Sequence, residues 1–146
     1  MSPEATEERV LEAVAKRREL VNDALDEEIP MQSPERLYEA TRHLLTAGGK
    51  RLRPTVSLLT AEALADVEPL SADYRSFPAL DGAEIDMLAA ATSIEVIQSF
   101  TLIHDDIMDD DDLRRGVPAV HKEYDTETAI LAGDTLYAKA FELLSE

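Results

Sequence analysis

The chain has 146 residues and a formal net charge of −17 at pH 7, because 31 acidic residues outnumber 14 basic ones. That charge argues against nucleic acid or an anionic membrane as a partner, and the absence of cysteine excludes disulfides and thiol chemistry. With 45% hydrophobic residues, the chain is expected to form one folded domain or part of one.

The first part of the chain predicts three helices. Apolar residues at helical spacing indicate the first helix over residues 10–25. Ser33 and Pro34 have the pattern of an N-cap and a first helical residue for the second helix. That helix should end at the two glycines 48–49, which suit a left-handed C-terminal cap, and Pro54 can open the third helix.

The second part predicts a loop followed by two more helices. Residues 66–82 contain prolines and show no clean period, as expected for a loop. Residues 83–109 lack proline and glycine and are apolar nearly all round, which predicts a buried central helix about 40 Å long. A polar loop ends near 116–118, and a last helix covers roughly 127–144. Because no strand-length alternation stands out, the predicted fold is an all-α bundle.

Three polar residues, Glu95, Gln98 and Asp105, interrupt the longest apolar stretches, so no run is expected to span a membrane. Residues 1–9 are acidic and polar and lack the pattern of a signal peptide. We therefore expect a cytoplasmic protein without stable membrane insertion. The scarcity of lysine beside so much acid is typical of proteins adapted to high salt, with an ordinary acidic protein as the alternative.

An acidic cluster follows the predicted central helix, with six aspartates among the eight residues 105–112. Asp105 and Asp109 are four residues apart, and Asp106 is three residues before Asp109, so the three would share one helix face. Carboxylates on one face suit Mg²⁺, which takes one or two protein carboxylates and completes its shell with water and phosphate. A solvated acidic turn is the alternative, which the apolar segment before the cluster disfavours.

Two groups of cations are candidates for binding an anionic ligand. Arg114 and Arg115 follow the aspartates and offer planar guanidinium forks for phosphate. In residues 48–54, Gly-Gly-Lys-Arg-Leu-Arg-Pro, two glycines allow the backbone to approach a ligand, and three cations precede a helix N-terminus. A turn with solvated cations is the alternative for this segment. Its glycine spacing does not match a Walker A loop.

Two further polar side chains lie near the acidic cluster. His104 is more consistent with a structural hydrogen bond than with a metal ligand, and the chain lacks the cysteines and paired histidines that zinc prefers. Gln98 lies two turns before Asp105 and hydrogen-bonds either a ligand or a neighbouring helix. Two anion sites and a Mg²⁺ cluster in an apolar bundle favour a substrate with diphosphate at one end and hydrocarbon at the other. Metal-assisted departure of diphosphate needs neither nucleophile nor general base, and the sequence offers neither.

Four segments resemble, in order, the short-chain isoprenyl diphosphate synthases of the polyprenyl synthetase family, and most of all an archaeal-type geranylgeranyl diphosphate synthase. The segments are residues 48–54, 95–98, 102–121 and 132–144. The resemblance extends from about residue 35 to the end of the chain. It implies the isoprenoid-synthase helical bundle, a Mg²⁺-dependent condensation of isopentenyl diphosphate with an allylic diphosphate, and a homodimer.

The resemblance also implies roles for individual residues. The first aspartate-rich motif of the family binds Mg²⁺, which implies Asp105, Asp106 and Asp109 as metal ligands. Arg114 would contact the allylic diphosphate. Isopentenyl diphosphate would be bound by a second set of side chains, comprising Arg115, Lys50 and Arg53, with Arg51 nearby and Gln98 at a position where the family usually has histidine. Glutamine still donates a hydrogen bond but carries no charge, so we expect a weaker contact there.

Product length is implied by the residues just before the aspartates. In this family, the fifth residue before the motif, here Phe100, can form the floor of the pocket for the growing chain. Thr101 at the fourth position is small, whereas animal-type farnesyl synthases have aromatics at both positions, and the two-residue insertion of the bacterial type is absent. The resemblance therefore implies geranylgeranyl diphosphate rather than farnesyl diphosphate as the product, with Phe100 as an ordinary core residue being the alternative.

The chain lacks one feature of the family. Its members are longer and carry a second aspartate-rich motif, which nothing after residue 112 replaces. We therefore expect residues 1–146 to be the N-terminal half of a single all-helical domain, from a truncated or incomplete chain that is inactive alone. The alternatives are a non-catalytic partner or regulatory subunit of a prenyl synthase, and a class I terpene cyclase, which shares the aspartate motif but lacks the cradle formed by Lys50 and Arg53.

Overall fold

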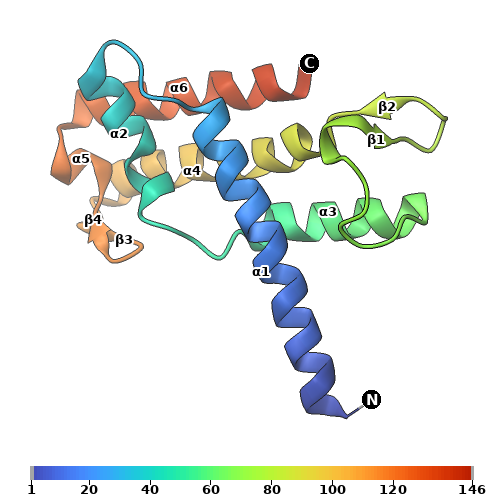
Figure 1. The fold of residues 1–146 in the computed structure, drawn as a ribbon. Coiled ribbons are helices and arrows are strands. Elements are labelled where there is room, and N and C mark those ends of the chain that lie inside the picture. Colours follow the sequence, from blue (N-terminus) through green and yellow to red (C-terminus); the bar gives the residue numbers. More distant parts are fainter. Residues whose placement is uncertain (1, 146) are drawn as a thin grey trace.

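The structure is a computed structural model that describes residues 2–145. It confirms the predicted all-α class, with short strands only in two small antiparallel pairs of the described chain (Figure 1). The helices are α1 (Pro3–Glu28), α2 (Glu35–Thr46), α3 (Leu52–Ala65), α4 (Met87–Asp109), α5 (Val120–Glu123) and α6 (Thr126–Ser145). A 3₁₀ turn, η1 (Tyr74–Ser76), precedes β1 (Phe77–Pro78), which pairs with β2 (Glu84–Ile85), and β3 (Leu113–Arg114) pairs with β4 (Val117–Pro118).

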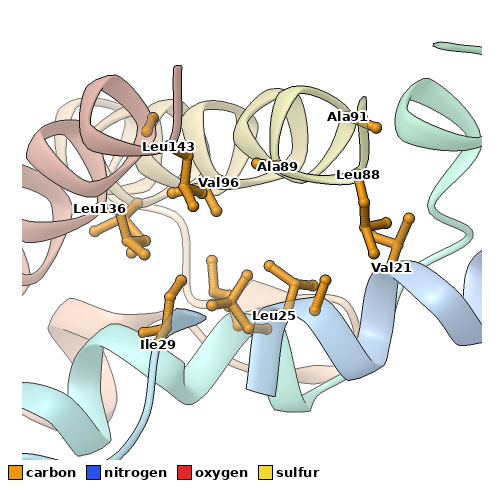
Figure 2. Packing of buried hydrophobic residues seen from close by; sticks show 14 of the residues in the cluster. Val21, Leu25, Ile29, Leu88, Ala89, Ala91, Val96, Leu136 and Leu143 are labelled. Carbon is orange, nitrogen blue, oxygen red and sulfur yellow. The ribbon is translucent and has the colours of Figure 1, made fainter. Parts of the chain in front are cut away.

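Helix α4 is the centre of the bundle. It packs along α6 over most of its length and also contacts α3 and α1, while α2 packs against α6 (Figure 1). Figure 2 shows how α1, α4 and α6 meet in the core, which contains Val21, Leu25, Ile29, Leu88, Ala89, Ala91, Val96, Leu136 and Leu143. The C-terminal half of α1 therefore belongs to the core, whereas its first turns extend away from the bundle (Figure 1).

Several predicted boundaries differ from the observed ones because caps and turns depend on local geometry. Helix α4 begins at Met87 rather than near residue 83, since Asp86 caps it by accepting a hydrogen bond from the Ala89 amide at 2.7 Å. Helix α2 has Pro34 at its N-cap and begins at Glu35, one residue later than predicted. Helix α3 begins two residues before Pro54. Neither α5 nor the two hairpins was predicted, because α5 has four residues and each strand only two, too few for a periodic pattern.

Helix α4 corrects one further expectation. By length and composition alone, its 23 residues are long and apolar enough to cross a membrane, although no such run was expected. In the fold, however, α4 is a core helix that carries buried polar side chains, including Glu95, Ser99 and Asp106. Because a core helix and a membrane span meet the same criterion, length and composition do not distinguish the two.

A buried ion pair links α1 to α3. The Nε and Nη2 atoms of Arg17 donate to Glu62 Oε2 at 3.2 and 2.6 Å, and both side chains are at most 5% exposed. The Tyr74 hydroxyl donates to the other oxygen of Glu62. Burial of the phenol, together with its bond to Glu62, raises the pKa of Tyr74 to about 12. These polar contacts fix how α1 crosses α3.

Candidate functional site

The last two turns of α4 present the aspartates in two different ways. Asp105 and Asp109 are exposed, whereas Asp106 is fully buried. The predicted three-carboxylate face is therefore formed only in part, because Asp106 points inward from it. Within residues 2–145, no three aspartate, glutamate or histidine side chains lie close enough together to hold a metal ion. The exposed pair at i and i+4 is the part of the motif open to a ligand.

Arg114 accounts for the burial of Asp106. Its Nε donates to Asp106 Oδ1 at 3.0 Å, and its Nη2 donates to the same oxygen. This hydrogen bond and the negative charge of Asp106 raise the pKa of Arg114 above its usual range, although partial burial opposes the shift. Asp106, a predicted metal ligand, and Arg114, predicted to bind diphosphate, thus neutralise each other's charge.

The other aspartates of the cluster also have cationic partners. Lys122 of α5 lies 2.7 Å from Asp110 and 3.4 Å from Asp112, and Asp111 lies 3.8 Å from Arg114. The bond to Lys122 lowers the pKa of Asp110. In the described chain, Asp105 and Asp109 are the members of the cluster without a hydrogen bond or ion pair, so they are the best-placed ligands for an added cation.

A tight hairpin holds the two arginines. Strands β3 and β4 pair Arg114 with Val117, which leaves Arg115 and Gly116 as the two turn residues. Both have positive φ, 54° and 77°, as a type I′ hairpin turn requires. Glycine adopts this conformation without a steric penalty, which is why Gly116 is needed here. The turn directs Arg115 back toward α2, where its Nη1 donates to the Leu44 carbonyl oxygen at 2.9 Å.

The glycine-rich connection between α2 and α3 divides its three cations into two groups. Lys50 and Arg53 are exposed, and in the described chain neither forms a hydrogen bond or an ion pair. Arg51 has a left-handed φ of 51°, and its side chain is only 2% exposed. Its guanidinium donates to Glu95, Asn22 and Leu45. That Arg51 binds substrate stays a prediction: its three nitrogens donate to groups of the protein, whereas Lys50 and Arg53 are exposed.

The tertiary structure brings the two cationic segments together. A Cβ on Gly49 would lie 2.9 Å from Arg51 Nη1 and 3.3 Å from Arg115 Cζ, so both guanidiniums pack against the backbone of this residue. Glu95 lies between them and accepts a hydrogen bond from each. Burial lowers the pKa of Arg115, against the influence of Glu95. Glu95 was not among the predicted site residues, although a carboxylate within an apolar core helix is a usable signal of a buried ionic contact.

Gln98 and Phe100 are half-buried side chains of α4, two residues apart. Gln98 is half-buried one turn after Glu95, and its backbone carbonyl oxygen accepts a hydrogen bond from the hydroxyl of the exposed Thr101. The Phe100 ring makes edge contacts with His104 at 4.8 Å and with Tyr137 of α6 at 5.2 Å between ring centroids. Phe141 continues this row of aromatic rings along α6. Phe100 thus begins an aromatic row between α4 and α6.

His104 has the structural role that the sequence favoured. Its Nε2 lies 3.3 Å from the Ile130 carbonyl oxygen of α6. A Cβ on Gly133 would lie 2.4 Å from the same nitrogen, so a larger residue there would collide with the imidazole. The lack of a side chain at Gly133 therefore allows α6 to approach α4 closely at His104.

Comparison with known proteins assigns this arrangement to a family. The polyprenyl synthetase family model matches residues 34–146, which contain both cationic segments and the aspartates. The chain belongs to the polyprenyl synthetase family. Its resemblance to isoprenyl diphosphate synthases, inferred above from four segments, is confirmed.

Relatives in the family are similar over nearly the whole chain. Geranylfarnesyl diphosphate synthase of Natronomonas pharaonis is 74% identical over 137 residues, which are 94% of this chain and 40% of that protein. Geranylgeranyl pyrophosphate synthase of Geoglobus acetivorans is 50% identical over 93% of this chain and 38% of its own length.

Solved structures of polyprenyl synthetases confirm the isoprenoid-synthase helical fold. The G. acetivorans geranylgeranyl pyrophosphate synthetase superposes with a TM-score of 0.76 over 90% of this chain and 38% of its own, at 50% identity. The Pyrococcus horikoshii geranylgeranyl pyrophosphate synthetase superposes with a TM-score of 0.74 at 39% identity. The match covers 94% of this chain and 38% of that protein. The chain thus spans about 40% of the length of the relatives it matches.

Proposed function

We propose that this chain provides the diphosphate- and metal-binding portion of a prenyltransferase that condenses isopentenyl diphosphate with an allylic diphosphate. One observation carries the proposal: the glycine-rich loop and the Arg114–Arg115 hairpin meet at Gly49, close to the end of α4 that carries the aspartates. Separately, either cationic segment would be an ordinary surface feature. Together they form one cationic region next to carboxylates that have no partner.

The residues present fit Mg²⁺. Asp105 and Asp109 offer hard oxygen donors on one helix face, and Mg²⁺ typically takes only one or two protein carboxylates beside substrate phosphate. When bound, the metal would stabilise negative charge on a departing diphosphate. Arg114 of this chain would bind the allylic diphosphate. Lys50, Arg53 and Arg115 would bind isopentenyl diphosphate, with Gln98 as a neutral donor.

The pairing of Asp106 with Arg114 adds a condition to ligand binding. Arg114 donates to Asp106, so a diphosphate must compete with that carboxylate for the guanidinium. A cation near Asp106 would compensate the carboxylate when Arg114 turns toward phosphate. We therefore propose that Mg²⁺ and diphosphate bind cooperatively to this site.

A chimaera tests the activity. Residues 1–146 would replace the matching N-terminal segment of the N. pharaonis synthase, which is 74% identical over this region. We expect prenyl product from isopentenyl and allylic diphosphates with Mg²⁺, and no product from the 146-residue chain alone, since the leaving group would be stabilised from one side only. An inactive but folded chimaera would support a non-catalytic subunit, and product from the allylic diphosphate alone would support a cyclase.

For the product we propose geranylgeranyl diphosphate. Phe100 is half-buried at the start of the aromatic row, where it can limit chain growth, and the small Thr101 leaves the adjacent position open. The 74%-identical relative is named a geranylfarnesyl diphosphate synthase, so a product one isoprene unit longer is the second candidate. We further propose that the protein is cytoplasmic and acts as a homodimer, which light scattering in solution would test.

Phe100 provides the test of product length. In the active chimaera, Phe100→Ala should lengthen the product, because it removes the first ring of the row, at some cost in stability from the cavity left behind. Chromatography of the dephosphorylated products measures the distribution. Phe141→Ala, farther along the row, is the matched control and should change it less. An unchanged distribution in a folded, active Phe100→Ala chimaera would identify Phe100 as an ordinary core residue.

A further inference from the structure

Glu95 joins the two cationic segments through a single oxygen atom. Its Oε1 accepts a hydrogen bond from Arg51 Nη1 at 2.8 Å and another from Arg115 Nη2 at 3.2 Å. The Glu95 side chain is 5% exposed and the Arg51 side chain 2%, while that of Arg115 is 18% exposed. The carboxylate thus stands at the centre of a buried cluster, and Arg115 is the member nearest to solvent.

The two arginines are held to different degrees. Arg51 is also fixed by Asn22 Oδ1 at 2.9 Å and by the Leu45 carbonyl oxygen at 2.7 Å, so all three of its nitrogens are bound. Arg115 has one other partner, the Leu44 carbonyl oxygen. Its Nε and the remaining Nη hydrogens have no acceptor in the described chain, so they stay available for a ligand. Arg51 therefore acts as a fixed anchor, whereas Arg115 depends on Glu95 for its position.

The negative charge of Glu95 is needed to keep the two positively charged arginines, Arg51 and Arg115, close together. Arg51 and Arg115 both pack against Gly49, and two guanidiniums this close repel each other strongly when buried. Glu95 is the acidic side chain that touches both. Without its charge, the repulsion would displace the less tightly held partner, which is Arg115. Removing one member of a buried ionic cluster generally leaves an uncompensated charge of this kind.

We propose that Glu95 is a positioning residue that holds Arg115 beside the glycine-rich connection between α2 and α3. In this position, Arg115 and Lys50 can bind the same diphosphate. The inference rests on the proposed function, since it concerns the arginine assigned there to isopentenyl diphosphate. Glu95 itself is buried, and its Oε1 accepts hydrogen bonds from the two guanidiniums. It acts through Arg115, and it also sets the distance between two loops that are far apart in the sequence.

Side-chain NMR of the 146-residue protein gives a first test that needs no substrate. In the wild type, two acceptors hinder rotation of the Arg115 guanidinium, so its Nη signals should not be averaged. Arg53 is exposed and unpaired in the described chain, so free rotation should average its Nη signals. Glu95→Gln should average the Arg115 signals and leave those of Arg51 restrained by Asn22 and Leu45. If the Arg115 signals of the wild-type protein are averaged as fully as those of Arg53, the proposal is overturned without any variant.

Binding of inorganic diphosphate in the presence of Mg²⁺, measured by calorimetry, gives the second test. We expect Glu95→Gln to weaken binding roughly tenfold, as for the loss of one charge-assisted hydrogen bond. The direction of the change in affinity is informative, because removing a negative charge would by itself tighten the binding of an anion. Unchanged or tighter binding by a folded Glu95→Gln variant would overturn the positioning role.

A matched variant controls for general destabilisation. Glu62→Gln also neutralises a buried glutamate that pairs with a buried arginine, but it lies in the α1–α3 contact away from the glycine-rich loop. It should lower thermal stability and leave both the Arg115 signals and diphosphate binding unchanged. An equal loss of binding in Glu62→Gln would show that the effect is only structural. If Glu95→Gln does not fold, Glu95→Asp keeps the charge but shortens the reach, and the same loss of Arg115 restraint is expected.

The two tests separate this inference from the proposed function. The diphosphate site itself is refuted if the wild-type chain binds no diphosphate, or if it binds diphosphate and Arg53→Ala leaves that binding unchanged. The Arg115 signals still decide whether Glu95 positions that arginine. If Arg53→Ala weakens binding while Glu95→Gln does not, the diphosphate site stands and the role of Glu95 is refuted.

Discussion

At the scale of single residues, the cations around the aspartate cluster decide which carboxylates are available. Asp106 is buried against Arg114, and Lys122 contacts both Asp110 and Asp112. Asp105 and Asp109 are left exposed on one face of α4. Residue type alone could not rank six aspartates within eight residues, since all have the same ligand chemistry. Their ranking comes from partners supplied by the β3–β4 hairpin and α5.

The first prediction compares two of these aspartates. In the active chimaera, Asp105→Ala should lower the rate far more than Asp111→Ala, because Asp105 lies on the exposed face with Asp109, whereas Asp111 lies beyond the helix and near Arg114. Steady-state kinetics at saturating Mg²⁺ measures both. Equal losses would refute the assignment of Asp105 as a metal ligand. A circular dichroism spectrum of each variant checks that the fold is retained.

The second prediction concerns the acid range. Bonds from Thr128 and Arg36 lower the pKa of Asp125 from its ordinary 3.8 to about 2. Because the folded-state value is depressed, the stabilisation is fully present above about pH 4 and is lost as the pH falls toward about 2. Asp125→Ala should therefore be less stable than the wild type at neutral pH, with the difference shrinking toward pH 2. Asp23→Ala, at an exposed position without a hydrogen bond or ion pair in the described chain, is the control.

At the scale of elements, polar side chains fix how the helices cross. The Arg17–Glu62 pair joins α1 to α3, and the Glu95 cluster joins α4 to both the α2–α3 connection and the β3–β4 hairpin. Amphipathic faces alone permit a range of crossing geometries, because apolar contacts are non-directional. Buried hydrogen bonds have strict geometry, so they select one arrangement of these elements.

The third prediction measures the α1–α3 link. Arg17→Met should destabilise the fold by about 3–5 kcal/mol, the usual cost of leaving a buried charge without its partner. Lys16→Met is the neighbouring control, since Lys16 pairs with Glu12 on the solvent side of the same helix and should matter little. Chemical denaturation of both variants gives the comparison. Similar stabilities for the two variants would show that the buried pair does not fix α1.

At the scale of the whole molecule, net charge is the dominant property. The formal charge of −17 is carried by a chain of 146 residues, so like charges repel across the surface. The charge of −17 already counts all 14 basic residues, so at least 17 carboxylates have no basic residue to balance them. We propose, as the composition suggested, that the protein is adapted to high salt, where screening reduces this repulsion.

The fourth prediction tests this adaptation. The unfolding temperature should rise substantially as KCl is increased from about 0.1 M to about 2 M, because the Debye length shortens and surface repulsion weakens. Differential scanning calorimetry at neutral pH measures it. A repeat near the isoelectric point of about 4.4, where net charge vanishes, is the control and should show a smaller salt effect. A salt-independent unfolding temperature at neutral pH would identify an ordinary acidic protein.

Sequence by itself determined the features that depend on nearby residues. Helical periodicity located the long helices, and the i,i+4 spacing placed Asp105 and Asp109 on one face, because backbone geometry links positions a few residues apart. Its errors at helix starts, such as Met87 instead of residue 83, reflect caps and short hairpins that leave little periodic signal.

Only the tertiary structure decided which distant charges meet. Glu95 bonds Arg51 across 44 positions and Arg115 across 20, and no local pattern encodes either distance. The same holds for Asp106, which the spacing placed with the exposed aspartates but which Arg114 draws inward. Buried charges must find partners wherever the packed helices bring them. Their pairing is therefore a property of the assembled bundle.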